Sequence, residues 1–423
     1  MKSLCDARAE LLRLQHRESE LLQEIVVVRK AVANQKVVID ELIKASAVPF
    51  IDRLPNELLI QIFLLIKLDR ERLARVSRRW RAIVIDIPGI WSEIDLEYYW
   101  LRKCPALKLH LARSRQTPLA ILDAYDLREL EVVLPHANRF HTLEIIGNTE
   151  NILSRISRVK FPSLQYLSID GRGESVDILP RIQSCVPALK HLELLGWRGP
   201  SSVSQIIAAE SLEELSLREI ASDWKFKNDS MHFPSLQRLT LDVRSPISFL
   251  ESIIAPKLVS FCYTAAYCDD PIPTKFGENW SKFNNVSRLT FTLPRFQIAS
   301  EETLLLSRSL CHIFRGIRYA DIQGDYVSML FSPCMDGRSP LDNWTCLETL
   351  DIRDFTFSSL RSFKCIVTWF TKRRNLGKRK LHFKLMQEHD TDDLVMLNAS
   401  NALYQTLQDC CASVVFDRVA VSC

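Results

Sequence analysis

The residue types that carry chemistry in proteins are present in this chain, but they are not grouped as catalysis or metal binding requires. The nine histidines are scattered, and of the twelve cysteines only Cys410 and Cys411 are adjacent. Adjacent cysteines cannot easily act as two ligands of one tetrahedral metal ion. Cys262 and Cys268 lie six residues apart with no histidine nearby, so we interpret them as small buried hydrophobic residues. We therefore expect no metal site and no cofactor.

Motifs of the common nucleotide-dependent and hydrolytic enzymes are missing from the sequence. Neither GxxxxGK[ST] nor GxGxxG follows an expected strand, and HExxH and GxSxG do not occur. The acidic stretch DTDD at 390–393 has the oxygen ligands that a cation needs, but a surface loop with helix-capping acids explains it more simply. The sequence therefore predicts a protein that is not an enzyme.

Charge and hydropathy argue against several other classes of protein. The 55 basic and 51 acidic residues nearly balance, which gives no reason to expect nucleic acid as the main partner. There is no apolar run of about 18 residues, so we expect no membrane span, and MKSLCDARAE at the start has no apolar stretch typical of a signal peptide. Dispersed cysteines indicate reduced thiols, and thus a protein of the cytoplasm or nucleus.

A local concentration of positive charge, KRRNLGKRK, occupies residues 372–380 and contains six basic residues. Such a run can serve as a nuclear signal or bind phosphate groups. A solvated loop between the last repeats is the simpler interpretation, and we adopt it.

The 423 residues are too many for one ordinary compact domain, and hydrophobic spacing divides them into regions. Residues 1–47 are expected to form a coiled-coil helix, since they contain no Pro or Gly and apolar residues recur with a heptad period. The a positions are Leu4, Leu11, Glu18, Ile25, Val32 and Ile39, and the d positions are Ala7, Leu14, Leu21, Val28, Gln35 and Leu42. Residues 4–42 thus predict pairing with a second copy or another protein. A single helix packed on its own chain is the alternative.

Residues 49–96 predict a compact block of three short helices. Pro49 ends the preceding helix, and Leu54-Pro55 marks the start of the next one. Ser77 is placed to cap the third helix of the block. Apolar residues recur at steps of three and four on several sides of this small block, so it is expected to need a partner.

The phrase Leu-x-x-Leu-x-Leu recurs through most of the remaining chain. Clear copies are FPSLQYLSID at 161–170, VPALKHLELL at 186–195 and FPSLQRLTLD at 233–242. Its second leucine position falls at 94, 119, 143, 167, 192, 215, 239, 261, 289, 320, 350 and 381, with spacings of 22 to 31 residues. Repeats of this kind bury their leucines by stacking on their neighbours, which predicts an α/β solenoid with a curved parallel sheet over residues 97–390. Residues 391–423 would cap it, with 414–421 as a last strand.

In a strand, the residues between buried leucines point to the opposite face. We expect these residues to form a continuous ridge on the concave side of the sheet and to contact a target protein, although a merely solvated face is the simpler alternative for any one of them. The candidate target-binding residues are Tyr166, Asp170, His191, Glu193, Glu214, Arg218, Arg238, Asp242, Arg288, Asp351 and Arg353.

Residues 51–96 resemble an F-box. The shared features are Leu54-Pro55-x-Glu57, Ile62-Phe63, the stretch from Val76 to Arg79-Trp80-Arg81, and Trp91 after the third helix. Ser77 stands where the family commonly has Cys. The order of coiled coil, F-box and leucine-rich repeats is similar to that in the large F-box families of mushroom-forming fungi.

The resemblance implies a substrate-recognition subunit of an SCF-type ubiquitin ligase. A Skp-family adaptor would bind the F-box and connect it to a cullin, while the leucine-rich repeats hold a target. The alternative is a repeat scaffold that binds the adaptor without directing ubiquitin transfer. The resemblance assigns adaptor binding to Leu54, Pro55, Leu58, Ile62, Phe63, Val76 and Trp80.

Overall fold

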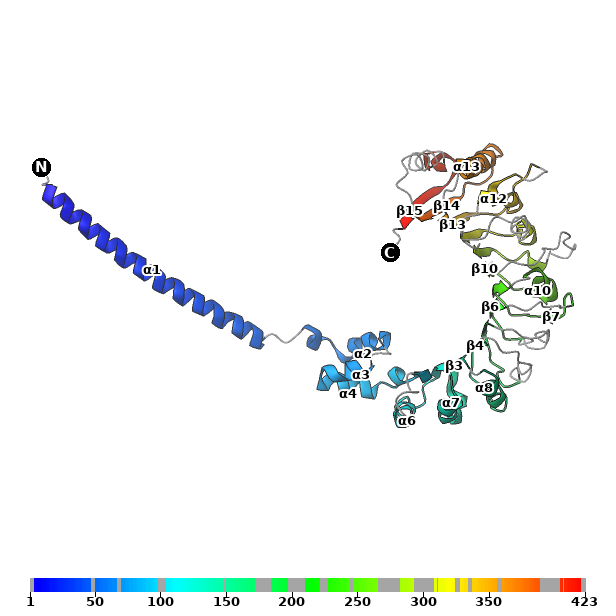
Figure 1. Cartoon of the computed structure of the whole chain (residues 1–423), viewed down its shortest axis with the longest axis horizontal. Helices are drawn as coiled ribbons and strands as arrows, with labels where there is room; N and C mark the ends of the chain where they lie inside the picture. Colours follow the sequence, from blue (N-terminus) through cyan, green and yellow to red (C-terminus); the bar gives the residue numbers. More distant parts are fainter. Residues whose placement is uncertain are drawn as a thin grey trace. The chain divides into compact units, whose positions relative to one another are not determined.

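The computed structural model shows a mixed α/β protein with a long N-terminal helix and a large parallel sheet (Figure 1). Contacts divide the chain into two units, Met1–Val84 and Ile85–Cys423, which we describe separately. The residues described are 4–46, 50–66, 70–97, 104–147, 149–171, 184–196, 210–220, 227–243, 246–264, 282–292, 308–309, 311–323, 328–333, 337–355, 360–388, 404–405 and 407–419.

The first unit opens with α1 (Leu4–Ser46), a continuous helix of 43 residues. The helix ends shortly before Pro49, as expected, because proline disfavours helical backbone in the residue before it. Residues 4–43 are all exposed, so the apolar seam of the heptads faces solvent. The sequence correctly predicts a long helix here, whereas its pairing stays a prediction.

Three short helices follow, as the sequence predicts. Ser77 caps the third of them, because its hydroxyl oxygen accepts the backbone N–H of Trp80 at 3.1 Å. Pro55 precedes the first of them, with its φ of −56° compatible with a helix start. These elements are η1 (Phe50–Arg53), α2 (Asn56–Leu65), α3 (Arg70–Val76) and α4 (Arg78–Asp86), and the boundary between the two units falls inside α4.

The second unit is built on a sheet of thirteen parallel strands that follow one another in sequence order. The strands β7 (Met231–His232) and β9 (Ile253–Ile254) form a separate two-stranded sheet. The thirteen are β1 (Glu93–Asp95), β2 (Leu119–Ala124), β3 (Phe140–Ile146), β4 (Tyr166–Asp170), β5 (His191–Leu195), β6 (Glu214–Ile220), β8 (Arg238–Val243), β10 (Ser260–Thr264), β11 (Arg288–Thr292), β12 (Tyr319–Gln323), β13 (Thr349–Phe355), β14 (His382–Glu388) and β15 (Ser413–Val419). An all-parallel sheet in sequence order is consistent with a solenoid-like arrangement.

The strands lie in register, so that equivalent residues form rows across the sheet. The row of second-leucine positions runs through Ile94, Ile121, Leu143, Leu167, Leu192, Leu215, Leu239, Phe261, Leu289, Ala320, Leu350, Phe383 and Val414. Two predicted positions of this row are wrong by two residues. Ile121 and Phe383 occupy the places in the row that were predicted for Leu119 and Leu381. A shift of two keeps the side chain on the same face of a strand, so both strands were still identified. The expected last strand at 414–421 joins the sheet as β15.

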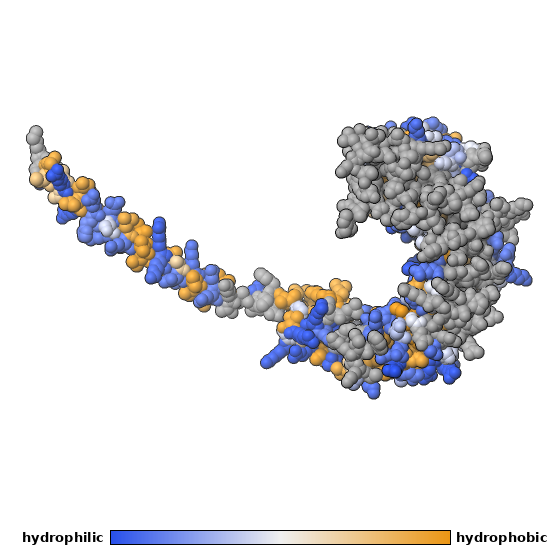
Figure 2. Space-filling view, in the orientation of Figure 1, coloured by the Kyte–Doolittle hydropathy of each residue, from blue (hydrophilic) through white to orange (hydrophobic). Residues whose placement is uncertain are grey.

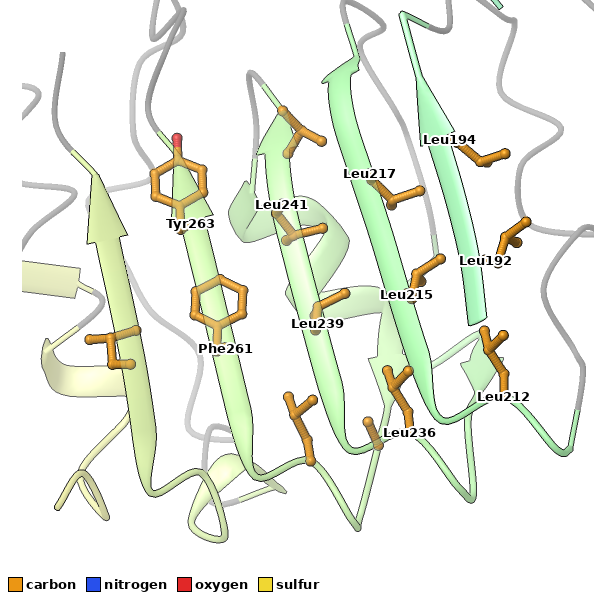
Figure 3. Close-up of a cluster of buried hydrophobic side chains, with 14 of the residues drawn as sticks. Leu192, Leu194, Leu212, Leu215, Leu217, Leu236, Leu239, Leu241, Phe261 and Tyr263 are labelled. Atoms are coloured by element: carbon orange, nitrogen blue, oxygen red, sulfur yellow. The ribbon is translucent and has the colours of Figure 1, made fainter. Parts of the chain in front are cut away.

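The labelled helices between the strands, such as α7, α8, α10 and α13, lie along the outer side of the curve that the strands line (Figure 1). The residues of the leucine rows point from the sheet into the layer between strands and helices, as Figure 3 shows for Leu192, Leu215, Leu239 and Phe261. Burying one such side chain contributes about 1.5–3 kcal/mol. Helical elements of this unit with described bounds include η3 (Pro88–Trp91), α6 (Cys104–Arg113), α7 (Leu127–Val133), η4 (Leu134–Arg139), α8 (Thr149–Ile156), α10 (Pro246–Ser252), α12 (Ser328–Phe331), η8 (Pro340–Asn343) and α13 (Leu360–Asn375).

The hydropathy of the helices does not fit a bilayer. Over the residues that the structure describes, no helix has the length and apolar content needed to cross a membrane.

Candidate functional site

The surface of α2 carries a row of exposed apolar side chains. Leu58, Ile62 and Leu65 are 51%, 37% and 87% exposed, and their spacing of four and three residues places them on one side of the helix. Leu59 and Phe63 on the other side are fully buried. The space-filling view shows the resulting hydrophobic patch in this region of the chain (Figure 2). Several large apolar side chains exposed side by side are typical of a docking surface. We call Leu58, Ile62 and Leu65 the α2 face.

The interior of the helical block holds the α2 face in place. Phe63 packs against Trp80 of α4 with ring centroids 4.7 Å apart. Arg79 of α4 donates from Nη2 to the carbonyl oxygen of Leu54 at 2.5 Å and from Nε to Oδ1 of Asn56 at 3.1 Å. These contacts fasten α4 to the start of α2, so the α2 face rests on a packed support rather than on a single helix.

The structure places six of the seven predicted adaptor-binding residues at the surface of the block. Pro55, Leu58, Ile62 and Val76 are exposed, while Leu54 and Trp80 are partly buried. The remaining one, Phe63, is fully buried against Trp80, so direct contact with a partner is excluded for it and its role is to support the α2 face. Sequence reasoning missed Leu65, which the period of Leu58 and Ile62 indicates.

Trp91, the last shared feature of the F-box resemblance, belongs to the second unit. It is buried, and its ring lies 4.6 Å from that of His110 in an edge-on arrangement. The guanidinium of Arg113 lies 4.5 Å from the centre of the same indole ring. Because His110 and Arg113 are on α6, Trp91 joins the end of the F-box-like region to the first helix beyond β1.

The face of the sheet opposite the helices, which we call the open face, carries most of the predicted target-binding residues, in two groups linked by hydrogen bonds and charge contacts. The first group covers β4 to β8. Tyr166 donates its hydroxyl to Glu193 at 2.8 Å, and Glu193 also lies 3.2 Å from Nε of Arg218. Glu214 on the next strand pairs with Arg238 and lies 3.0 Å from Nδ1 of His191. The sheet therefore brings together six residues that lie up to 72 positions apart in sequence.

The second group covers β11 to β13. Arg353 pairs with both carboxylate oxygens of Asp321, and the Tyr319 hydroxyl donates to Asp351 at 2.8 Å. The guanidinium of Arg288 lies 4.9 Å from the centre of the Tyr319 ring, within the range of a cation–π contact. Tyr319 and Asp321 were not among the predicted residues, although they flank Ala320 and alternation along the strand places them on the open face.

Two other predicted target-binding residues lie outside these groups. Asp170 is buried, which corrects the expectation that it faces solvent at the end of β4. Asp242 is partly buried on β8.

Burial and hydrogen bonding perturb the ionisable groups of the open face. Burial, followed by the bond to Glu193, raises the pKa of Tyr166 to about 12, and burial with the bond to Asp351 does the same for Tyr319. Both tyrosines therefore stay protonated donors at neutral pH. Burial and then the charge of Arg238 lower the pKa of His191, which favours a neutral ring at neutral pH in its contact with Glu214.

The first strands of the open face are acidic. Glu93 and Asp95 of β1 lie in register beside β2, and Glu144 follows on β3. Burial is the main cause that raises the pKa of Asp123 and of Glu144, and the neighbouring carboxylates raise both further. The open face thus changes from acidic at β1–β3 to paired charges at β4–β13. Such a surface can bind a protein segment, and within the described residues no cluster of three metal-ligating side chains accompanies it.

The basic run at 372–380 is mostly exposed, as the sequence suggests, but it is only partly a loop. Its first four residues form the last turn of α13, and Gly377, with a φ of +65°, ends the helix. Arg373 is buried and donates from Nη2 to the carbonyl oxygen of Leu347 at 3.2 Å, while Arg379 pairs with Glu348 at 2.8 Å. Arg373 is therefore held within the fold, while most of the other residues of the run face solvent.

The structure describes three of the cysteines singled out in the sequence. Cys410 and Cys411 are buried, and burial raises the pKa of Cys411 to about 12, so this thiol stays protonated. Cys262 is not fully buried, because it lies between Thr240 and Thr290 on the open face. Cys268 and the stretch at 390–393 lie outside the described residues.

Comparison with known families agrees with the geometry of the helical block. Residues 51–97 match the F-box-like family. The comparison with curated proteins found no match. The matched range contains the α2 face, its support by Phe63 and Trp80, and the anchoring Trp91. Residues 51–97 are therefore an F-box-like domain.

Proposed function

We propose that this protein is the substrate-recognition subunit of an SCF-type ubiquitin ligase. The observation that carries the proposal is the α2 face, a row of exposed apolar residues within the F-box-like domain. F-box domains bind Skp-family adaptors, and the adaptor in turn connects to a cullin that holds the ubiquitin-conjugating enzyme. In this role the chain itself performs no chemistry, and it works in the cytoplasm or nucleus.

The sheet supplies the second half of the proposal. We interpret the strands and their returning helices as leucine-rich repeats, which is supported by leucine rows that stay in register across thirteen strands. Target capture is assigned to the open face because its residues converge from many strands onto one surface. Paired charges with tyrosine and hydroxyl groups suit a protein segment better than a polyanion, since cations do not dominate the face.

Co-purification with a Skp-family adaptor tests the proposal. Leu54→Ala combined with Pro55→Ala should abolish adaptor binding, because the change removes the apolar side chain and the proline ring that directly precede α2. The circular dichroism and melting temperature of the sheet unit should not change. Adaptor binding that survives this double variant, and also Trp80→Ala, would remove the F-box role. Adaptor binding without a cullin would instead support the alternative of a scaffold that directs no ubiquitin transfer.

A further inference from the structure

The helix α1 leaves an apolar seam uncovered over its whole length. At the a and d positions the apolar side chains from Leu4 to Leu42 are 43–69% exposed. A helix of 43 residues is about 65 Å long at 1.5 Å per residue. In water, helices gain most of their stability by packing such a face rather than from intrinsic propensity.

The period of the seam determines what kind of surface can cover it. Apolar residues recur strictly every seven positions through six heptads, and only Glu18 and Gln35 interrupt them. A straight α-helix drifts by about 20° per heptad against such a repeat, so the seam would turn by roughly 120° around an unsupercoiled helix. Only a helix of similar length that supercoils with α1 can follow it. Elsewhere in the described part of the chain the longest helix is α13, with 16 residues, which is too short.

A second copy of α1 meets this requirement, and we propose that two chains pair through α1 as a parallel, in-register coiled coil. This proposal goes beyond the ligase function and does not depend on it. In a parallel pair, a g residue faces the e residue five positions later in the other chain. Glu24 then faces Arg29 of the second copy, twice per pair, and Val38 faces Ile43. The remaining g–e contacts pair Glu10 with Gln15, Arg17 with Leu22 and Ala31 with Lys36, and none of them brings like charges together.

The antiparallel arrangement is disfavoured by the same residues. With Leu4 layered against Leu42, e residues face e residues and g residues face g residues. Arg8 then meets Lys36 of the second copy twice, and Glu24 meets its own equivalent. Like charges at such positions repel, so the charges at the flanking e and g positions favour the parallel pair.

The two polar layers fix the register of the parallel pair. Gln35 faces Gln35 of the second copy at a d layer, where the two amides can hydrogen-bond to each other. Glu18 faces its equivalent at an a layer, which costs stability. Arg17 occupies the preceding g position beside that layer, and it already reaches a carboxylate in the single helix, Glu20, at 2.9 Å. A polar layer of this kind lowers stability but penalises shifted registers, where it would face apolar residues.

Sedimentation equilibrium of the full chain tests the pairing with two matched valine variants. Val28 is at a d position and Val37 at an outward f position, and both are similarly exposed in the single helix. Val28→Glu should raise the dimer dissociation constant at least about a hundredfold, and Val37→Glu less than about threefold. Both variants alter intrinsic helix propensity equally, so any difference between their circular dichroism spectra reports the lost packing of the seam and not propensity. A wild-type chain that is monomeric at all micromolar concentrations, or equal effects of the two variants, would overturn the proposal.

Disulfide formation tests the orientation in a Cys5→Ser background. In the parallel pair, Ala7→Cys places two thiols at facing d positions, within the 4.4–6.8 Å Cα separation that a disulfide requires. Mild oxidation should then give a covalent dimer, whereas Ala9→Cys at the outward f position should not. If Ala7→Cys fails to link while a mixture with Ile39→Cys does, the pair is antiparallel and the proposed orientation is wrong.

Discussion

Truncation of the α2 face should separate adaptor binding from folding. We consider the triple change of Leu58, Ile62 and Leu65 to Ala. Together the exposed surface of these three residues is close to that of two fully exposed residues. Full burial of one such side chain contributes about 1.5–3 kcal/mol, and Ala keeps only the first carbon of it. We therefore expect the adaptor to bind about 3 kcal/mol more weakly, which corresponds to roughly a hundredfold higher dissociation constant.

Folding should be almost unaffected by the same change. The three side chains lie on the outer side of α2, and Ala has a high helix propensity. Surface substitutions of this kind usually change the free energy of unfolding by less than about 0.5 kcal/mol. The assay is calorimetric titration with the Skp-family adaptor, alongside thermal melting. Leu376→Ala is the matched control, because Leu376 is a similarly exposed leucine outside the F-box-like domain.

A small effect on adaptor binding would refute this reasoning. If the triple variant is folded and its dissociation constant rises by less than about threefold, the α2 face is not the surface that the adaptor covers. If Leu376→Ala weakens adaptor binding as much as the triple variant does, the loss of binding cannot be assigned to the F-box-like domain.

Three further predictions follow from other contacts. Phe63→Ala should destabilise the helical block by about 3–5 kcal/mol and abolish adaptor binding through local unfolding, seen as faster hydrogen exchange over residues 50–84. Glu144→Gln should stabilise the chain at pH 7 but not near pH 3.5, as measured by urea denaturation at the two pH values. Burial raises the pKa of Glu144 in the folded chain, so the charged carboxylate lowers the free energy of unfolding only as pH rises above about 4.3, the pKa of Glu in the unfolded chain. Changing Arg218, Arg238 and Arg288 together to Gln should reduce target capture in cross-linking but leave the melting temperature nearly unchanged, since exposed pairs contribute under about 1 kcal/mol each.

Gln is the appropriate replacement for these arginines because the structure shows their partners. Arg218 and Arg238 lie against Glu193 and Glu214, so charge reversal would place two carboxylates side by side and disturb the sheet as well as the target site. Equal target capture by the neutral triple variant, with the protein shown to be folded, would move the site to another part of the chain.

The strand positions could be predicted from the sequence because alternation along a strand is a local property. Leu192 and Leu194 point into the core while His191 and Glu193 face the other way, as two-residue alternation requires. The predicted position at Leu119 was less accurate, because β2 begins at this residue and Ile121 occupies the second-leucine row. Its row in the sheet is set by pairing with β1 and β3, which no local pattern contains.

The contacts within the candidate sites could not be predicted in the same way. Tyr166 and Glu193 are 27 residues apart, and their hydrogen bond depends on the register of neighbouring strands and the length of the connection between them. Arg373 belongs to the run that the sequence assigns to a solvated loop, and arginines are rarely buried. Its guanidinium is buried here because carbonyl oxygens of the surrounding chain accept its hydrogen bonds.

Reconstitution of the full chain with a Skp-family adaptor and a cullin tests the central proposal most directly. Light scattering coupled to size-exclusion chromatography would give the mass of the complex formed. A stable assembly that contains all three proteins, and that is lost when Leu54 and Pro55 are both changed to Ala, is the result we predict. A folded chain that does not associate with the adaptor, or an adaptor complex that excludes the cullin, would contradict the assignment to an SCF-type ubiquitin ligase.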